Sequence, residues 1–198
     1  MSPKSFIKKV AAMSSLGAIA VGSLLAGEEI AATVPAEKGK VLVVYYSWSG
    51  NTEALAKKIQ RATNAAIFKI EPETPYPQDY SKCTEQAKKE LAQKFRPKIK
   101  AFPENVETYD TVFVGSPNWW GTYAPPVATL LDDPAFARKT IVPFFTNGGG
   151  GLQNCESDMK KQLPQAKFLK AITLPGSKAK SGGDREVAAW LKEIGIAK

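Results

Sequence analysis

From Lys40 onward, the chain alternates short apolar runs with segments in which apolar residues recur at helical spacing. We expect strands at residues 41–46, 66–71, 111–115, 140–145 and 168–174. We expect a helix after each strand, at residues 52–63, 79–95, 125–131, 152–163 and 184–194, with Asp79 and Asp184 as N-caps. Five such units predict an α/β fold with a doubly wound, five-stranded parallel sheet and helices on both faces.

The first, third and fourth predicted strands are the most continuously apolar of the five. This pattern is typical of central strands that are covered on both faces. In doubly wound sheets, ligands bind beyond the carboxyl ends of the strands, where the strand order reverses. The loops after these three strands are therefore the candidate ligand site.

The loop after the first strand is rich in hydroxyl groups and leads directly into a helix. Its residues are Ser47, Trp48, Ser49, Gly50, Asn51 and Thr52. Backbone N–H groups at a helix N-terminus, with the helix dipole behind them, form an anion site. The chain has neither a G-x-x-x-x-G-K-[ST] loop nor a G-x-G-x-x-G pattern, so a terminal phosphomonoester fits best. The alternative is that these hydroxyls only cap the helix.

The other two loops carry aromatic residues and glycines. The loop after the third strand contains Pro117, Asn118, Trp119, Trp120 and Gly121, and the loop after the fourth contains Thr146, Asn147, Gly148 and Gly149. Adjacent tryptophans in a loop rarely both point into a core, so we expect at least one indole to be exposed or covered by a flat aromatic ligand. The glycines allow close approach of a ligand, although a mobile turn before the next helix is the alternative.

The chain contains no histidine. This excludes His-based acid–base catalysis, His-ligated zinc and Ser-His-Asp or Cys-His hydrolysis. The two cysteines, Cys83 and Cys155, form no Cys-x-x-Cys pair and leave either a lone disulfide or two free thiols. We therefore assign no catalytic residue and no metal ligand, and expect the chemistry to come from a cofactor.

Residues 1–36 differ from the rest of the chain. Lys4, Lys8 and Lys9 precede an uncharged apolar stretch at residues 10–26, and small and polar residues follow. This order is typical of a secretory signal peptide with a short linker, and an uncleaved membrane anchor is the alternative. We expect an exported protein, periplasmic or otherwise outside the cytoplasm, whose folded domain spans residues 37–198.

The net charge is +8. The lysines lie at helical spacing and are not interleaved with aromatic residues, which is typical of solvated helix faces. We therefore expect no nucleic-acid binding, and membrane contact only through an uncleaved N-terminal segment.

The three loops resemble those of the flavodoxin-like family, in particular its bacterial branch with a Trp-Trp-Gly second loop. In that family the first loop reads [ST]-x-[ST]-G-x-[ST] and holds the phosphate of FMN, which implies phosphate binding by residues 47–52. Residues 117–121 and 146–151 match loops that lie against the isoalloxazine ring. The resemblance covers the chain from about Lys40 and implies the strand order 2-1-3-4-5.

The resemblance implies a non-covalent FMN protein that acts in electron transfer. One alternative is an NAD(P)H-dependent quinone or flavin oxidoreductase on the same fold, and another is a domain that has lost its flavin. The absence of a second cofactor fingerprint favours the carrier. Well-known soluble flavodoxins are acidic, whereas this chain is basic, so we expect a redox partner protein that is acidic.

Overall fold

The computed structural model describes residues 40–196. The expected signal peptide and linker at residues 1–36 lie outside this range. Among the helices in the range, none has the length and hydrophobicity that a membrane span requires.

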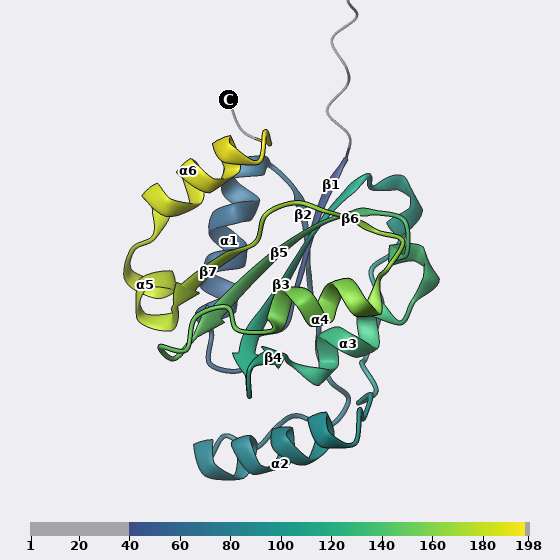
Figure 1. Ribbon diagram of the computed structural model, residues 1–198, viewed down its shortest axis with the longest axis vertical. Coiled ribbons are helices and arrows are strands. Elements are labelled where there is room, and N and C mark those ends of the chain that lie inside the picture. Colours follow the sequence, from purple (N-terminus) through teal and green to yellow (C-terminus); the bar gives the residue numbers. More distant parts are fainter. Residues whose placement is uncertain (1–39, 197–198) are drawn as a thin grey trace, which may run out of the picture. The chain divides into compact units, whose positions relative to one another are not determined.

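A parallel sheet forms the centre of the domain (Figure 1). Its strands are β1 (Val41–Tyr45), β2 (Ala66–Lys69), β3 (Thr111–Trp119), β5 (Thr140–Asn147), β6 (Lys167–Phe168) and β7 (Ile172–Pro175). They lie in the order β2-β1-β3-β5-β6, and β7 also pairs with β5. A short strand, β4 (Thr122–Tyr123), turns back antiparallel on the end of β3. The predicted α/β class and the order 2-1-3-4-5 are confirmed, with β6 and β7 together forming the fifth strand.

The fifth strand is divided because it gains one residue relative to β5. Ile141 of β5 pairs with Phe168, whereas Phe144 pairs with Ile172, so the edge strand advances one residue more between the two pairs. Such an extra residue bends the strand as a β-bulge. The indole of Trp190 donates a hydrogen bond to the carbonyl oxygen of Lys170 inside this bulge (2.8 Å), which satisfies a group that the ladder leaves unpaired.

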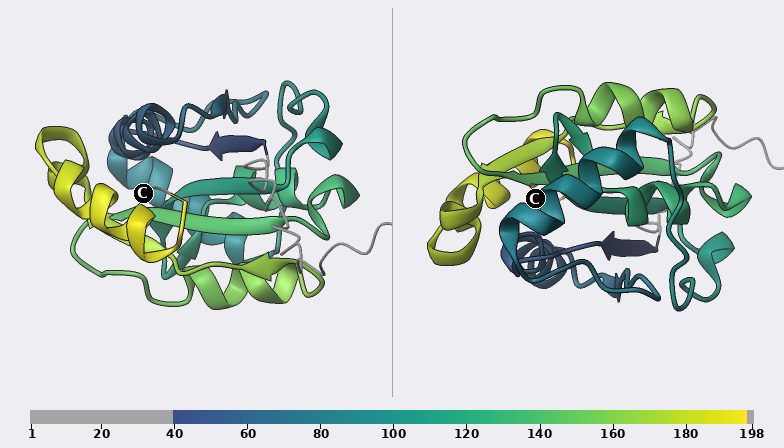
Figure 2. Two further views of the ribbon diagram at one scale, coloured as in Figure 1. Left: turned by 90° about the horizontal axis from the view of Figure 1, so that it is seen from above. Right: turned by 90° about the horizontal axis from the view of Figure 1, so that it is seen from below.

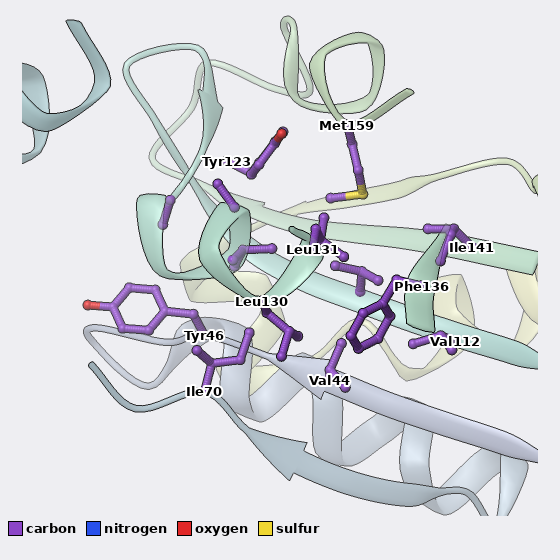
Figure 3. Close-up of a cluster of buried hydrophobic side chains, with 14 of the residues drawn as sticks. Val44, Tyr46, Ile70, Val112, Tyr123, Leu130, Leu131, Phe136, Ile141 and Met159 are labelled. Atoms are coloured by element: carbon purple, nitrogen blue, oxygen red, sulfur yellow. The ribbon is translucent and has the colours of Figure 1, made fainter. Parts of the chain in front are cut away.

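The sheet has a separate apolar core on each face because successive side chains of a strand alternate in direction. The helices are α1 (Asn51–Thr63), α2 (Tyr80–Ala92), α3 (Pro125–Leu131), α4 (Cys155–Gln162), α5 (Gly176–Ser181) and α6 (Asp184–Glu193). Val43 and Phe113 belong to the core under α1 and α6. Val44 and Val112 belong to the opposite core, where Phe136 packs with them (Figure 3).

Of the two predicted helix N-caps, one is confirmed and the other is wrong. Asp79 caps α2 as expected and accepts a hydrogen bond from the Lys82 amide (2.9 Å). At α6 the N-cap is Gly183, whose φ of 84° no other residue adopts readily, and Asp184 is the first helical residue. The short helix α5 was not predicted.

Helix α2 lies across the carboxyl end of the sheet, below β3 in Figure 1 and in front of the strands in the right view of Figure 2. The sequence pattern predicted it only as one of the helices that cover the faces. Its buried residues are Cys83, Ala87 and the polar Glu90, so its apolar stripe is too narrow to cover a sheet face. Its position places it directly over the candidate ligand edge.

Candidate functional site

A pocket of about 350 Å³ opens at the carboxyl edge of the sheet. Its lining includes most of the predicted ligand residues, namely Trp48, Ser49, Asn51, Pro117, Asn118, Trp119, Trp120, Thr146, Asn147 and Gly148. Helix α2 adds four that sequence reasoning missed, namely Tyr80, Cys83, Thr84 and Ala87. The predicted residues Ser47, Gly50, Thr52, Gly121 and Gly149 do not line the pocket. The three loops and α2 thus surround one cavity.

The loop after β1 presents unused hydrogen-bond donors. Gly50 is the N-cap of α1, with φ 82°, and within residues 40–196 no side chain caps the helix. The first intrahelical bond runs from the Ala54 amide to the Gly50 carbonyl (3.0 Å), so the preceding amides have no partner within the helix. The alternative that the loop hydroxyls cap α1 is therefore wrong. These amides are available to an anion.

Ser47 has a buried hydroxyl with no hydrogen-bond partner within the described part of the chain. A buried polar group without a partner is costly, and native proteins rarely keep one without a reason. A ligand oxygen at the uncapped end of α1 would satisfy this hydroxyl.

Thr52 and Thr146 connect the loops after β1 and β5. Their hydroxyl oxygens are 2.8 Å apart, and the two residues are 1% and 3% exposed. One of the two hydroxyl hydrogens forms this bond, so the pair retains one donor for a ligand oxygen. Thr52 is therefore both a connection between loops and a candidate donor.

The two tryptophans lie at a tight turn, with Trp119 just before it and Trp120 within it. Trp119 pairs with Thr122, which makes Trp120 and Gly121 the two turn residues, and their φ values of 54° and 88° are those of a type I′ turn. Positive φ suits Gly121 but strains the backbone of Trp120. The turn directs the Trp120 indole outward, where it is 58% exposed, as the sequence predicted for at least one indole.

Trp119 lies in an aromatic cluster behind the pocket. Its ring meets Tyr46 at 5.5 Å and Tyr76 at 4.9 Å between centroids, in both cases edge to face. Tyr76 donates a hydrogen bond to the buried Glu90 carboxyl group, which also accepts one from Gln86 (2.8 Å). Burial, with a contribution from Glu90, raises the pKa of Tyr76, so its hydroxyl stays protonated as a donor. The cluster fixes the orientation of the Trp119 indole.

Asn118 and Asn147 hold the loops in shape. The Asn118 amide group accepts from the Gly121 amide (3.0 Å) and donates to the carbonyl of Gly151 (2.8 Å) and to Gln153 (2.9 Å). Asn147 donates to the Thr173 hydroxyl of β7 (2.9 Å). Both side chains are thus already occupied, and they position the loops around the pocket.

Two indoles hold α2 over the pocket. Trp48 donates a hydrogen bond to the Pro77 carbonyl (3.0 Å) just before the helix, and its ring packs on Tyr80. Trp120 donates to the Thr84 carbonyl (3.0 Å). No sequence pattern indicates these contacts, because they join segments far apart in the chain.

The cysteines are both free and buried. Cys83 lines the pocket, and Cys155 begins α4. Burial raises the pKa of Cys83 to about 11 and that of Cys155 to about 12. Both thiols are therefore protonated and poorly reactive near neutral pH.

A doubly wound sheet with an uncapped, hydroxyl-rich loop after β1 and aromatic loops after β3 defines a flavodoxin-like α/β protein. The chain belongs to the flavodoxin family, whose sequence model matches residues 40–194.

Solved structures agree with this assignment. A Bacteroides eggerthii protein is 31% identical, with 78% of this chain and 97% of that chain covered and a TM-score of 0.69. A Bacteroides uniformis protein is 27% identical, with 79% and 99% covered and a TM-score of 0.70. A Lactobacillus acidophilus flavoprotein, solved in complex with FMN, is 26% identical, with 77% and 98% covered and a TM-score of 0.62.

Proposed function

We propose that this protein binds FMN non-covalently at the carboxyl edge of the sheet and transfers electrons through it. The observation that carries the proposal is the buried, unpartnered hydroxyl of Ser47 beside the uncapped N-terminus of α1. The FMN complex of the Lactobacillus relative supports the same ligand for this fold.

The residues around the pocket fit the parts of FMN. The α1 amides and the hydroxyls of Ser47, Ser49 and Thr52 would hold the phosphate, because they are donors and carry no competing negative charge. Trp119 and Trp120 would lie along the flat ring system, where aromatic contact favours binding. FMN supplies one- and two-electron chemistry when bound, and the protein supplies orientation and water exclusion.

The pocket itself offers little for proton transfer. Its titratable side chains, Tyr80 and Cys83, include no carboxylate and no amine. Burial keeps the Cys83 thiol protonated, with a pKa of about 11. This set favours an electron carrier, whose chemistry needs no acid or base from the protein.

A titration of the purified residue 37–198 domain with FMN tests the proposal. We expect flavin fluorescence to be quenched with a saturable stoichiometry of one, and riboflavin, which lacks the phosphate, to bind more weakly. An absorption spectrum without flavin bands after incubation with FMN would contradict binding. Rapid anaerobic bleaching by NADH or NADPH alone would contradict the carrier role and indicate an NAD(P)H-dependent oxidoreductase.

A further inference from the structure

Helix α5 brings one lysine to the phosphate loop. A methyl group placed on Gly50, the N-cap of α1, would lie 3.8 Å from Cε and 4.0 Å from Nζ of Lys180. The ammonium group therefore lies beside the loop that holds the unpartnered Ser47 hydroxyl and the free amides at the start of α1. Neither the family loop pattern nor the pocket lining includes this lysine.

Close packing fixes α5 in this position. A Cβ on Gly176, the first residue of α5, would lie 2.2 Å from the amide nitrogen and 2.7 Å from Cγ of Asn51. Only glycine therefore allows α5 to approach the start of α1 this closely. The helix ends before Gly183, where φ is 84° and a Cβ would lie 2.9 Å from Leu174 Cδ1. The backbone that carries Lys180 is thus packed against α1 where α5 begins and against Leu174 of β7 just after α5 ends.

Lys180 differs from the lysines around it in its charge partners. Lys178, on the same helix, pairs with Glu186 (2.5 Å), and Lys58 of α1 pairs with Asp184 (2.9 Å). Lys180 has no ion pair with any residue in the range 40–196. Its charge is therefore uncompensated at a site that already presents donors to an anion.

We propose that Lys180 is a phosphate-binding residue, which supplies a positive charge to the terminal phosphate of FMN in addition to the neutral donors of the loop. The inference rests on the proposed FMN binding. The attraction between an ammonium group and a phosphate does not depend on their relative orientation. A flexible lysine beside the loop can therefore bind the phosphate without being held in one fixed conformation. It prefers the dianion, which forms above the second phosphate pKa of about 6.

Variants of Lys180 test the inference through FMN affinity. We expect Lys180→Gln to raise the Kd for FMN about tenfold at low ionic strength, and to leave the Kd for riboflavin unchanged. Lys180→Arg, which keeps the charge, should stay close to wild type. Lys178→Gln is the matched control, because it removes the same charge from the same exposed helix, and it should change the Kd by less than about twofold.

Salt and pH provide independent readouts. The difference between wild type and Lys180→Gln should shrink as ionic strength rises to about 0.5 M, because salt screens an exposed charge pair. Wild-type affinity should increase between about pH 5 and pH 7.5, and this increase should be smaller in Lys180→Gln.

The outcomes separate the two proposals. If wild type binds no FMN, the proposed function fails. If wild type binds FMN but Lys180→Gln behaves like Lys178→Gln, or weakens FMN and riboflavin equally, the assignment of Lys180 is overturned and the neutral donors alone hold the phosphate.

Discussion

At the scale of single residues, Ser47 is the side chain for which we expect opposite effects on the stability of the free protein and on ligand binding. Its hydroxyl is buried and has no partner among residues 40–196. Leaving such a group unsatisfied costs roughly 1–3 kcal/mol. A phosphate oxygen would recover this energy on binding, so the residue couples stability of the free protein to affinity for the ligand.

We therefore predict opposite effects of Ser47→Ala on stability and binding. The variant should raise the free energy of unfolding of the FMN-free protein by about 1 kcal/mol, because the unsatisfied group is gone, and weaken FMN binding about tenfold or more. Urea unfolding and FMN titration measure the two effects. Ser49→Ala, at an exposed position of the same loop, is the control and should not stabilise the free protein. A loss of stability in Ser47→Ala would contradict the prediction.

At the scale of elements, helix α2 covers one side of the pocket. It is attached to the rest of the pocket by the Trp120 hydrogen bond to Thr84 and by the Lys88 ammonium 5.0 Å from the Trp120 ring. The strained turn that presents Trp120 is thus compensated by contacts to another element. Movement of α2 away from the loops would expose the pocket without disturbing the sheet.

Replacing Trp120 should loosen α2 selectively. Loss of one hydrogen bond and one cation–π contact lowers the local opening free energy by about 1–2 kcal/mol, so α2 amides in Trp120→Ala should exchange roughly tenfold faster. Trp120→Phe, which keeps a ring but loses the donor, should show a smaller increase. Hydrogen exchange read by mass spectrometry checks this, with α1 as the internal reference. Unchanged exchange in α2 would show that other contacts hold the helix.

At the scale of the whole molecule, the positive net charge should affect how fast the protein meets its redox partner. We propose that the protein docks an acidic partner near the pocket rim, where Tyr80 is 72% and Trp120 58% exposed and Lys82 and Lys88 of α2 are also exposed. Opposite charge accelerates encounter, and salt weakens the effect.

Ferricyanide, a small anionic oxidant, probes this charge. Oxidation of the reduced FMN protein by ferricyanide should slow severalfold as ionic strength rises to about 0.5 M. Lys82→Glu at the rim should slow it further at low salt, whereas Lys192→Glu on α6 changes the net charge equally and should have less effect. Oxidation rates that do not change with ionic strength, or equal effects of the two variants, would contradict docking at a positively charged pocket rim.

The buried tyrosine hydroxyls and cysteine thiols predict that the folded protein loses stability at alkaline pH. Burial raises the pKa of Tyr45 and Tyr123 to about 12, as it raises those of Cys83 and Cys155 to about 11 and 12. Above pH 9 the unfolded chain releases these protons while the folded protein keeps them. Since the folded state then binds more protons, the free energy of unfolding must fall as pH rises.

We expect the urea midpoint to be nearly constant from pH 7 to 8.5 and to fall from about pH 9 to 11. Each group that is ionised only in the unfolded chain contributes a slope of up to roughly 1.4 kcal/mol per pH unit. Urea unfolding monitored by circular dichroism at several pH values measures this. A midpoint that stays constant or rises between pH 9 and 10.5 would contradict the pKa directions.

Local patterns were sufficient to predict the parallel sheet and the three candidate ligand loops, whereas the strand order came from the family resemblance. Apolar runs of strand length, helix periodicity and the loop residues 47–52 depend on neighbours in the chain, so they can be read without knowing the fold. The pairing of Gly115 with Phe144 is different: a Cβ on Gly115 would lie 2.1 Å from the Phe144 ring, a contact that only the aligned strands reveal.

The sequence by itself determined the fold class and identified the three loops that lie together at the carboxyl edge of the sheet. Only the tertiary structure decided that α2 covers the pocket, that Asn118 joins two loops, and that Lys180 lies beside Gly50. Each of these depends on contacts between segments far apart in the chain. Local propensity carries no information about such contacts, because packing geometry sets them after the elements have formed.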